Sequence, residues 1–276
     1  MRSFPFHPMT GFDFFLAGWA VAALLMLGAW IVQWRTRDAG VVDFTWAAGL
    51  GVLGLGYALA ADGDPWRRIL VAILAGGWSF RLAAYILFNR VIGKPEDGRY
   101  QRLREHWREH TQLKFFGFFQ AQALLTAVFA VPFLVVALAP ERLPLPALVA
   151  AVLIWLLAVG GETLADRQLA AWRADPAHRG RTCRAGLWRY SRHPNYFFEW
   201  LHWWSYPLLA WGSPEWWLTL LGPALMLYTL LKVTGIPYTE QQALASRGDD
   251  YRAYQRSTSA FIPWFPKKES GACSKP

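Results

Sequence analysis

The sequence predicts an all-α integral membrane protein, a polytopic bundle of about seven transmembrane helices. Hydrophobic residues make up 54% of its 276 residues and charged residues only 17%. Several apolar runs approach the roughly 20 residues that a spanning helix needs. Basic residues gather between these runs, as they do in loops that set membrane topology. We expect one membrane-embedded domain over residues 1–266 and a flexible tail over 267–276.

Turn signals and charged segments separate the expected helices. A polar turn at 35–40 separates the first two, and the turn Asp62–Pro65 the next two. A charged segment, 91–112, divides the two halves, Pro140 closes the fourth helix, and a basic loop at 173–192 precedes the sixth. We predict helices at Phe12–Gln33, Val41–Ala61, Trp66–Arg90, Lys114–Leu138, Leu145–Trp172, Pro194–Trp211 and Glu215–Thr234, then an amphipathic tail at Gly235–Tyr254.

The distribution of Lys and Arg predicts the orientation. Most of them lie in three segments, 90–114, 167–192 and 232–275. The positive-inside rule places all three in the cytoplasm, with the N-terminus outside and the C-terminus cytoplasmic. Arg67 and Arg68 fall on the opposite side, where we expect them to snorkel. The first apolar segment is too long for a cleaved signal peptide, so we expect it to be retained.

Composition also excludes several function classes. The net charge of +9 is spread over loops, and no zinc-finger, basic-zipper or RNA-binding motif accompanies it, so no nucleic-acid partner is expected. Cys183 and Cys273 are far apart and indicate neither a disulfide framework nor a metal site. The 17 Trp suit membrane lipids and a flat, lipid-like substrate, and equally suit ordinary interfacial belts.

The stretch 186–200 carries the strongest chemical signal. Pro194 fits the first turn of a helix, whose N–H groups and positive dipole end attract an anion. Arg189 and Arg192 precede that turn, which favours a phosphate. Asn195 and Glu199 are four residues apart and therefore share one helix face.

Polar residues within apolar segments form further candidate groups, because such residues usually face a cavity. Asp43 lies at the start of the second helix. It either caps that helix or places a carboxyl group near a substrate carbonyl. Trp78, Arg81, Tyr85 and Asn89 form one stripe on the third helix, next to Arg90, for packing or for function. Arg81 is too deep to snorkel easily, and Asp43 is its first candidate partner.

A third group lies late in the fifth helix. Glu162 and Asp166 share a face, and two acids at a helix C-terminus oppose the dipole. They are either solvated charges or partners of a specific ligand, together with Arg173. The tail adds polar residues that we group with the stretch 186–200: Tyr238, Glu240, Asp250, Tyr251 and Tyr254.

These blocks resemble the steroid 5-alpha-reductase and sterol-reductase superfamily. The C-terminal domain of that superfamily is similar to Gly186–Glu199, Asp250–Tyr254 and Phe261–Phe265. The strongest resemblance is to a bacterial branch, once filed as a domain of unknown function. Motifs of that branch are matched by Asp43–Trp46, Trp78–Leu82 and Glu96–Tyr100.

The resemblance implies a seven-helix protein of a bacterial inner (cytoplasmic) membrane that reduces a carbon–carbon double bond with NADPH. The cofactor would enter from the cytoplasm and bind within residues 150–266. Its contacts would be Glu162, Asp166, Arg173, Arg189, Arg192, His193, Asn195, Tyr196, Glu199, Tyr238, Glu240, Asp250, Tyr251 and Tyr254. The superfamily's helix-three tyrosine, which polarises a steroid ketone, falls on Trp78, and its acidic partner near Asp43. Asp43, assisted by Arg81 or Tyr85, would polarise the substrate or supply the proton.

Two other functions stay open at this point. Isoprenylcysteine carboxyl methyltransferases are similar in the same Arg-His-Pro block and bind S-adenosylmethionine. They commonly carry a Glu-Glu pair where this chain has the single Glu240. A non-enzymatic lipid-binding membrane protein is the third possibility.

Overall fold

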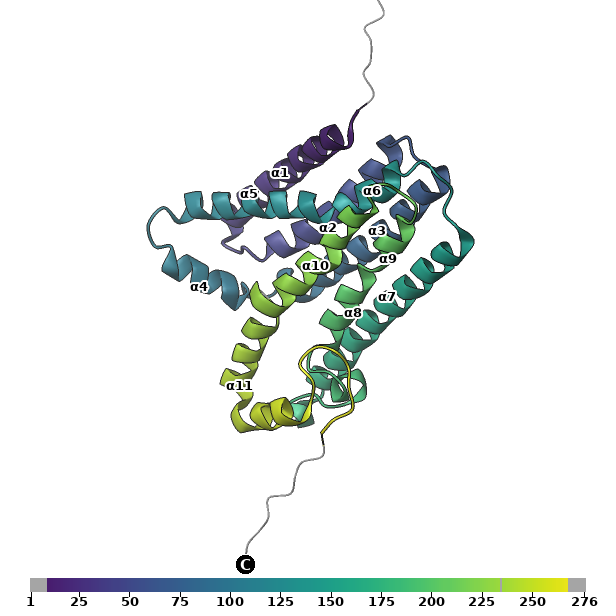
Figure 1. Ribbon diagram of the computed structural model, residues 1–276. Coiled ribbons are helices and arrows are strands. Elements are labelled where there is room, and N and C mark those ends of the chain that lie inside the picture. The colour runs from purple at the N-terminus through teal and green to yellow at the C-terminus, as the bar shows by residue number, and fades with distance from the viewer. Residues whose placement is uncertain (1–8, 234, 268–276) are drawn as a thin grey trace, which may run out of the picture. The chain divides into compact units, whose positions relative to one another are not determined.

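The computed structural model describes residues 9–233 and 235–267, and this part of the chain is helical without a named strand. Six of its helical segments are long and apolar enough to cross a membrane, which confirms an all-α, polytopic integral membrane protein (Figure 1). These segments are Gly11–Thr36, Val41–Ala60, Pro65–Val91, Thr111–Leu138, Leu145–Ala174 and Trp216–Ser257. The expected flexible tail falls almost wholly on 268–276, outside the described residues.

The first half contains α1 (Gly11–Thr36), α2 (Val41–Ala60), α3 (Pro65–Ile86) with its π-helical end η1 (Leu87–Val91), α4 (Gly98–His106), α5 (Thr111–Phe129) and α6 (Val131–Leu138). The second half contains α7 (Leu145–Ala174), the short 3-10 turns η2 (Pro176–His178) and η3 (Gly186–Arg189), α8 (Pro194–His202), α9 (Ser205–Leu209), η4 (Trp216–Leu220), α10 (Leu221–Tyr228), η5 (Thr229–Val233) and α11 (Ile236–Ser257). The expected bounds of the first five membrane helices therefore agree with the structure to within a few residues.

The chain divides into two compact units. Unit 1 contains the residues up to Leu148 together with Tyr206–Gly222, and unit 2 contains Val149–Ser205 and the residues from Pro223 onward. Unit 2 covers most of the region 150–266 in which the sequence places the cofactor. The single domain expected over residues 1–266 stays a prediction.

In unit 1, α2 packs against α1, α3 and α5. Glycines of α2 let α3 approach that helix closely, since a Cβ built on Gly54 of α2 would lie 3.2 Å from the Cβ of Ala75 of α3. Small residues of this kind allow helices to pack tightly within a membrane.

Arg67 does not snorkel as the sequence suggests. Its side chain is 1% exposed, and it donates to three backbone carbonyls. Nε bonds Glu141 O at 2.7 Å, one terminal nitrogen bonds Trp211 O at 2.8 Å, and the other bonds Leu209 O. Arg68 likewise donates to the carbonyls of Ala58 and Leu59. The two arginines thus satisfy backbone groups that would otherwise lack partners.

Two segments differ from the sequence prediction. The expected sixth helix is two short helices, α8 and α9, separated at Trp203–Trp204. Pro207 has no N–H to donate to the carbonyl four residues earlier, which is that of Trp203, so the helix cannot run through. The charged segment 91–112 holds an additional helix, α4, capped by Asp97, which accepts a hydrogen bond from Arg99 N.

In unit 2, α8 lies close against α7. A Cβ on Gly161 would come within 2.5 Å of the Phe198 ring, so a larger residue would push the helices apart. The expected amphipathic tail is α11, which changes direction at Gly248, where φ is +52° (Figure 1). Glycine adopts this conformation with little strain.

Candidate functional site

The stretch before α8 is fixed on α7. Gly186 has φ +57°, and a Cβ there would lie 2.3 Å from the Gln168 side chain. The Leu187 N–H donates to Gln168 Oε1 at 2.9 Å, and the Trp188 indole N–H donates to the Ala165 carbonyl at 2.9 Å. These contacts hold the start of α8 beside the last three turns of α7.

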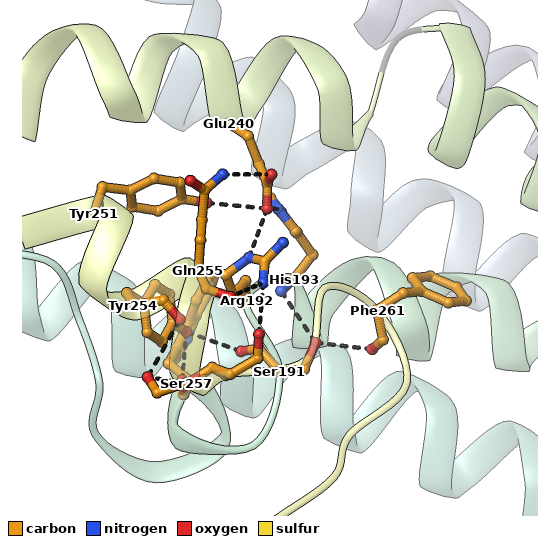
Figure 2. A network of polar contacts seen from close by, with 11 residues as sticks. Ser191, Arg192, His193, Glu240, Tyr251, Tyr254, Gln255, Ser257 and Phe261 are labelled. Atoms are coloured by element: carbon orange, nitrogen blue, oxygen red, sulfur yellow. Dashed lines mark hydrogen bonds and ion pairs between the residues drawn. The ribbon is translucent and has the colours of Figure 1, made fainter. Parts of the chain in front are cut away.

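A polar cluster centred on Glu240 ties this stretch to α11 (Figure 2). We call its members, Arg192, His193, Glu240, Tyr251 and Gln255, the Glu240 network. Glu240 Oε1 accepts from Arg192 Nε at 2.6 Å and lies 3.3 Å from His193 Nε2 and 3.4 Å from the Tyr251 hydroxyl. Oε2 accepts from Gln255 Nε2 at 2.8 Å. The structure therefore brings together four of the residues that the sequence singles out, and adds Gln255.

Arg192 is committed to the protein itself. Its Nη1 also donates to the carbonyls of Gln255 and Thr258 at 3.1 and 2.5 Å. The Arg192 and Glu240 side chains are only 11% and 16% exposed, so their ion pair is largely shielded from water. Burial lowers the pKa of His193 below its ordinary value, and the Glu240 carboxylate offsets only part of this effect. His193 is therefore neutral near pH 7.

Two acids of α7 are buried beside the start of α8. Glu162 and Asp166 lie one turn apart and are 3% and 7% exposed. Asn195, on the first turn of α8, donates from Nδ2 to Asp166 Oδ1 at 3.1 Å. Glu199 is half-buried one turn further along the face of Asn195. The structure thus brings Asp166 of α7 and Asn195 of α8 into contact, and their role in binding a cofactor stays a prediction.

Arg173 and Arg189 are exposed, and within the described residues neither pairs with a carboxylate. Their positive charge remains available to an external anion, in contrast with that of Arg192.

The remaining candidates of α11 hold the neighbouring loops. Asp250 accepts from the Thr182 N–H at 2.7 Å and from Arg184 at 2.9 Å. The Tyr254 hydroxyl donates to the carbonyls of Ser191, at 3.0 Å, and Trp188. The local bonds of these two residues are therefore structural.

Two further tyrosines lie at the start of the same helix pair. Tyr196 stacks on His193 with ring centroids 5.3 Å apart, and its hydroxyl is 3.2 Å from Thr239 Oγ1. The Tyr238 hydroxyl accepts from Gln242 at 2.6 Å.

Asp43 in unit 1 has different partners from the one expected. Its two oxygens accept from the Arg99 guanidinium and the Tyr100 hydroxyl, both at 2.7 Å. The expected pairing with Arg81 is wrong, because α4 places the opposite charge of Arg99 directly at the start of α2. With two donors on its oxygens, Asp43 is also no simple helix cap.

The stripe on α3 is divided by burial. Trp78 is fully buried, with its ring 6.4 Å from that of Trp46 in an edge contact. Arg81 and Tyr85 are half-buried, and the Arg90 guanidinium lies 6.0 Å above the Tyr85 ring. Trp78 is thus part of the core of unit 1.

Sequence reasoning missed the role of α4 as the partner of Asp43. Burial alone would lower the pKa of Arg99, but the Asp43 carboxylate keeps it above its ordinary value. Burial, and then the Asp43 charge, raise the pKa of Tyr100 well above its ordinary value. Glu96 accepts from the Ala39 N–H and from Arg104, each at 2.8 Å. The sequence did contain an indication of this pairing, because the motif Asp43–Trp46 carries an acid and the motif Glu96–Tyr100 carries Arg99.

Fold and site together define an integral membrane protein with a buried acid–amide cluster in unit 2 and a carboxylate–tyrosine pair in unit 1. The chain belongs to the family described as "Protein of unknown function (DUF1295)", whose model matches residues 29–258. No curated protein and no solved structure matches the chain.

Proposed function

We propose that this protein is a membrane-embedded, NADPH-dependent reductase. It adds a hydride to an activated carbon–carbon double bond of a lipid-like substrate, such as a steroid, an isoprenoid or a fatty-acyl lipid. The observation that carries the proposal is the part-buried contact between Asn195 and the buried Asp166, one turn from the buried Glu162. The resemblance of the same residues to the reductase superfamily supports it.

The residues of unit 2 fit a dinucleotide. The carboxylates of Glu162 and Asp166 can accept hydrogen bonds from ribose hydroxyls or from the N–H groups of a carboxamide. The amide of Asn195 can both donate and accept. The exposed guanidinium groups of Arg173 and Arg189 suit the phosphates. Arg192 is bonded to Glu240 instead, so we assign it the role of bracing α11 rather than contacting a phosphate.

NADPH supplies the hydride, and the protein must supply a proton. Asp43 accepts from both Arg99 and Tyr100, so it acts as an ionised carboxylate and not as the acid. The raised pKa of Tyr100 keeps its hydroxyl protonated. We therefore assign proton donation to Tyr100: its hydroxyl, which donates to Asp43 in this structure, turns to the substrate carbon that receives the proton, and the Arg99 guanidinium, 5.1 Å above the Tyr100 ring, offsets the charge of the phenolate that remains. This assignment replaces Arg81 and Tyr85 as the helpers of Asp43.

The proposed setting is a bacterial inner membrane, with the N-terminus outside and the cofactor reached from the cytoplasm. The arginine-rich segments support this orientation through the positive-inside rule.

The first prediction concerns the cofactor. Purified protein is expected to bind NADPH, and Asn195→Ala is expected to weaken binding about tenfold or more, because one buried hydrogen-bonding group is lost. Asn89→Ala is the matched control, since within the described residues the Asn89 side chain bonds the backbone carbonyl of Tyr85, one turn earlier in the same helical segment. Titration calorimetry in detergent measures both, and equal affinities for the two variants would remove Asn195 from the site.

The same titration separates the alternatives. Binding of S-adenosylmethionine without NADPH would establish the methyltransferase, and binding of neither would favour a non-enzymatic lipid-binding protein.

The second prediction concerns the proton. Tyr100→Phe is expected to slow NADPH consumption about 100-fold, with unchanged NADPH affinity, because the proton donor is lost. A panel of conjugated enones and unsaturated acyl lipids serves as substrate. Hydrogen exchange over α4 is the structural control, since Arg99 and Glu96 still hold that helix. A wild-type rate in Tyr100→Phe would return Tyr100 to a purely structural role.

A further inference from the structure

The segment that follows α11 is held in a defined position by backbone bonds. The Arg192 N–H donates to the Ser259 carbonyl at 2.9 Å, and the Trp264 N–H donates to the Tyr190 carbonyl at 2.9 Å. Between them, Ser191 Oγ donates to the Phe261 carbonyl at 2.8 Å (Figure 2). Residues 259–264 are therefore fixed along the stretch 190–192.

The side chains of this segment divide into one that is buried and three that are exposed. Phe261 packs against Phe197 and Trp200, with ring centroids 5.8 and 5.7 Å apart. Its three large apolar neighbours, by contrast, are exposed. They are Ile262 at 59%, Trp264 at 70% and Phe265 at 77%. A backbone held by these bonds thus presents a large apolar surface, of which only Phe265 has a ring contact within the described residues, to Tyr190 at 6.0 Å between centroids.

The depth of this surface follows from its attachment to α7. That helix has 30 residues, or about 45 Å of length, whereas the hydrocarbon core takes about 30 Å, or roughly 20 residues. Counted from Leu145, the core ends near Leu164. The bonds of Trp188 and Leu187 to Ala165 and Gln168 therefore place the stretch 187–192, and the segment attached to it, at the boundary of the bilayer.

The charged residues nearest in sequence to the exposed side chains, on either side, are all positive. Arg189, Arg256 and Lys267 are exposed, and neither 176–198 nor 251–267 contains an Asp or Glu. Aromatic side chains concentrate at membrane–water interfaces, and Lys and Arg are attracted to anionic headgroups.

We propose that residues 261–267 form an interfacial anchor, whose Ile262, Trp264 and Phe265 insert into the headgroup region of an anionic phospholipid leaflet. The anchor fixes the stretch 190–192, and with it the Glu240 network, at the membrane surface. This inference does not depend on the proposed reductase activity.

A spin label tests the anchor. Phe265→Cys, in a chain that also carries Cys273→Ser, is labelled with a nitroxide, while the buried Cys183 is left in place. Asp249→Cys is the matched control, because the Asp249 side chain is 94% exposed. The measurement, in nanodiscs that contain phosphatidylglycerol, is the ratio of label relaxation by dissolved oxygen to label relaxation by a water-soluble nickel chelate. This ratio should be several-fold higher for the label at 265 than for the label at 249.

Charge is the second arm of the experiment. The oxygen preference at 265 should decrease in nanodiscs of phosphatidylcholine alone, and also when Arg256→Gln and Lys267→Gln are combined. Equal access of the nickel chelate to both labels would overturn the anchor. So would a label at 265 that is shielded from both reagents and shows a short distance to the label of a second copy, since the surface would then be a protein contact.

Discussion

Replacing Arg192 with alanine is expected to destabilise unit 2 by about 3 kcal/mol, the cost of leaving one member of a buried ion pair without its partner. Glu240 would keep its contacts to Tyr251 and Gln255 but lose the guanidinium that pairs with it. The carbonyls of Gln255 and Thr258 would lose their donor as well. NADPH affinity should fall in parallel, because α11 would no longer be braced against the start of α8.

The buried thiol of Cys183 gives a direct readout of this loss, since it is 3% exposed in folded unit 2. In a Cys273→Ser background, a thiol-reactive fluorophore should label Arg192→Ala at a clearly lower temperature than the parent protein. Arg189→Ala is the control, because Arg189 is exposed and should leave the transition unchanged. Adding Glu240→Gln to Arg192→Ala should restore part of the stability by removing the unpaired charge. A transition of Arg192→Ala equal to that of Arg189→Ala would contradict the brace.

Hydrophobicity and turn chemistry were sufficient to predict most of the helices. The bounds of α1, α2 and α7 differ from the predicted ones by only a few residues, because each is a long apolar run between charged or proline-containing turns. The break between α8 and α9 was missed, because the apolar run continues through it and only Pro207 marks it. The helix α4 was missed for the opposite reason: Tyr100 is its only buried residue, so no apolar periodicity is present.

The candidate site shows where spacing along one helix stops being informative. Spacing predicted that Glu162 and Asp166 share one helix face and that Asn195 and Glu199 share another, but the contact between Asp166 and Asn195 is seen only in the structure. By contrast, Arg99, the partner of Asp43, lies 56 residues further along the chain. Whether Asp43 pairs with Arg81 or with Arg99 depends on where α4 lies relative to the start of α2, and helix spacing does not give that position. The ion pair between Arg192 and Glu240 could not be predicted from the sequence either. An arginine just before a helix has the same sequence pattern whether it binds a ligand or a carboxylate of its own chain.

Replacing Arg67 with methionine is expected to destabilise unit 1 by about 3–6 kcal/mol. Methionine fills much of the same volume, so the loss comes from the hydrogen bonds rather than from a cavity. Three carbonyls would lose a charged donor: that of Leu209 is buried, and those of Glu141 and Trp211 are part-buried. Each unsatisfied buried carbonyl costs about 1–3 kcal/mol, and the two part-buried carbonyls cost less than that, because water can reach them at this end of the helix. Lysine should not rescue the variant, because a single ammonium lacks the planar fork that reaches three acceptors.

Thermal unfolding followed by circular dichroism measures this loss, with Arg68→Met as the matched control. Arg68 is the next residue and also donates to carbonyls, but those of Ala58 and Leu59 lie at the end of α2, and one of its two bonds is exposed. Water can take over at such a site, so Arg68→Met should cost less than about 1 kcal/mol. Equal losses for the two variants would show that Arg67 acts as an ordinary interfacial charge. A much larger loss for Arg67→Met would show that the carbonyls of Glu141, Leu209 and Trp211 depend on a side chain of α3 for their hydrogen bonds.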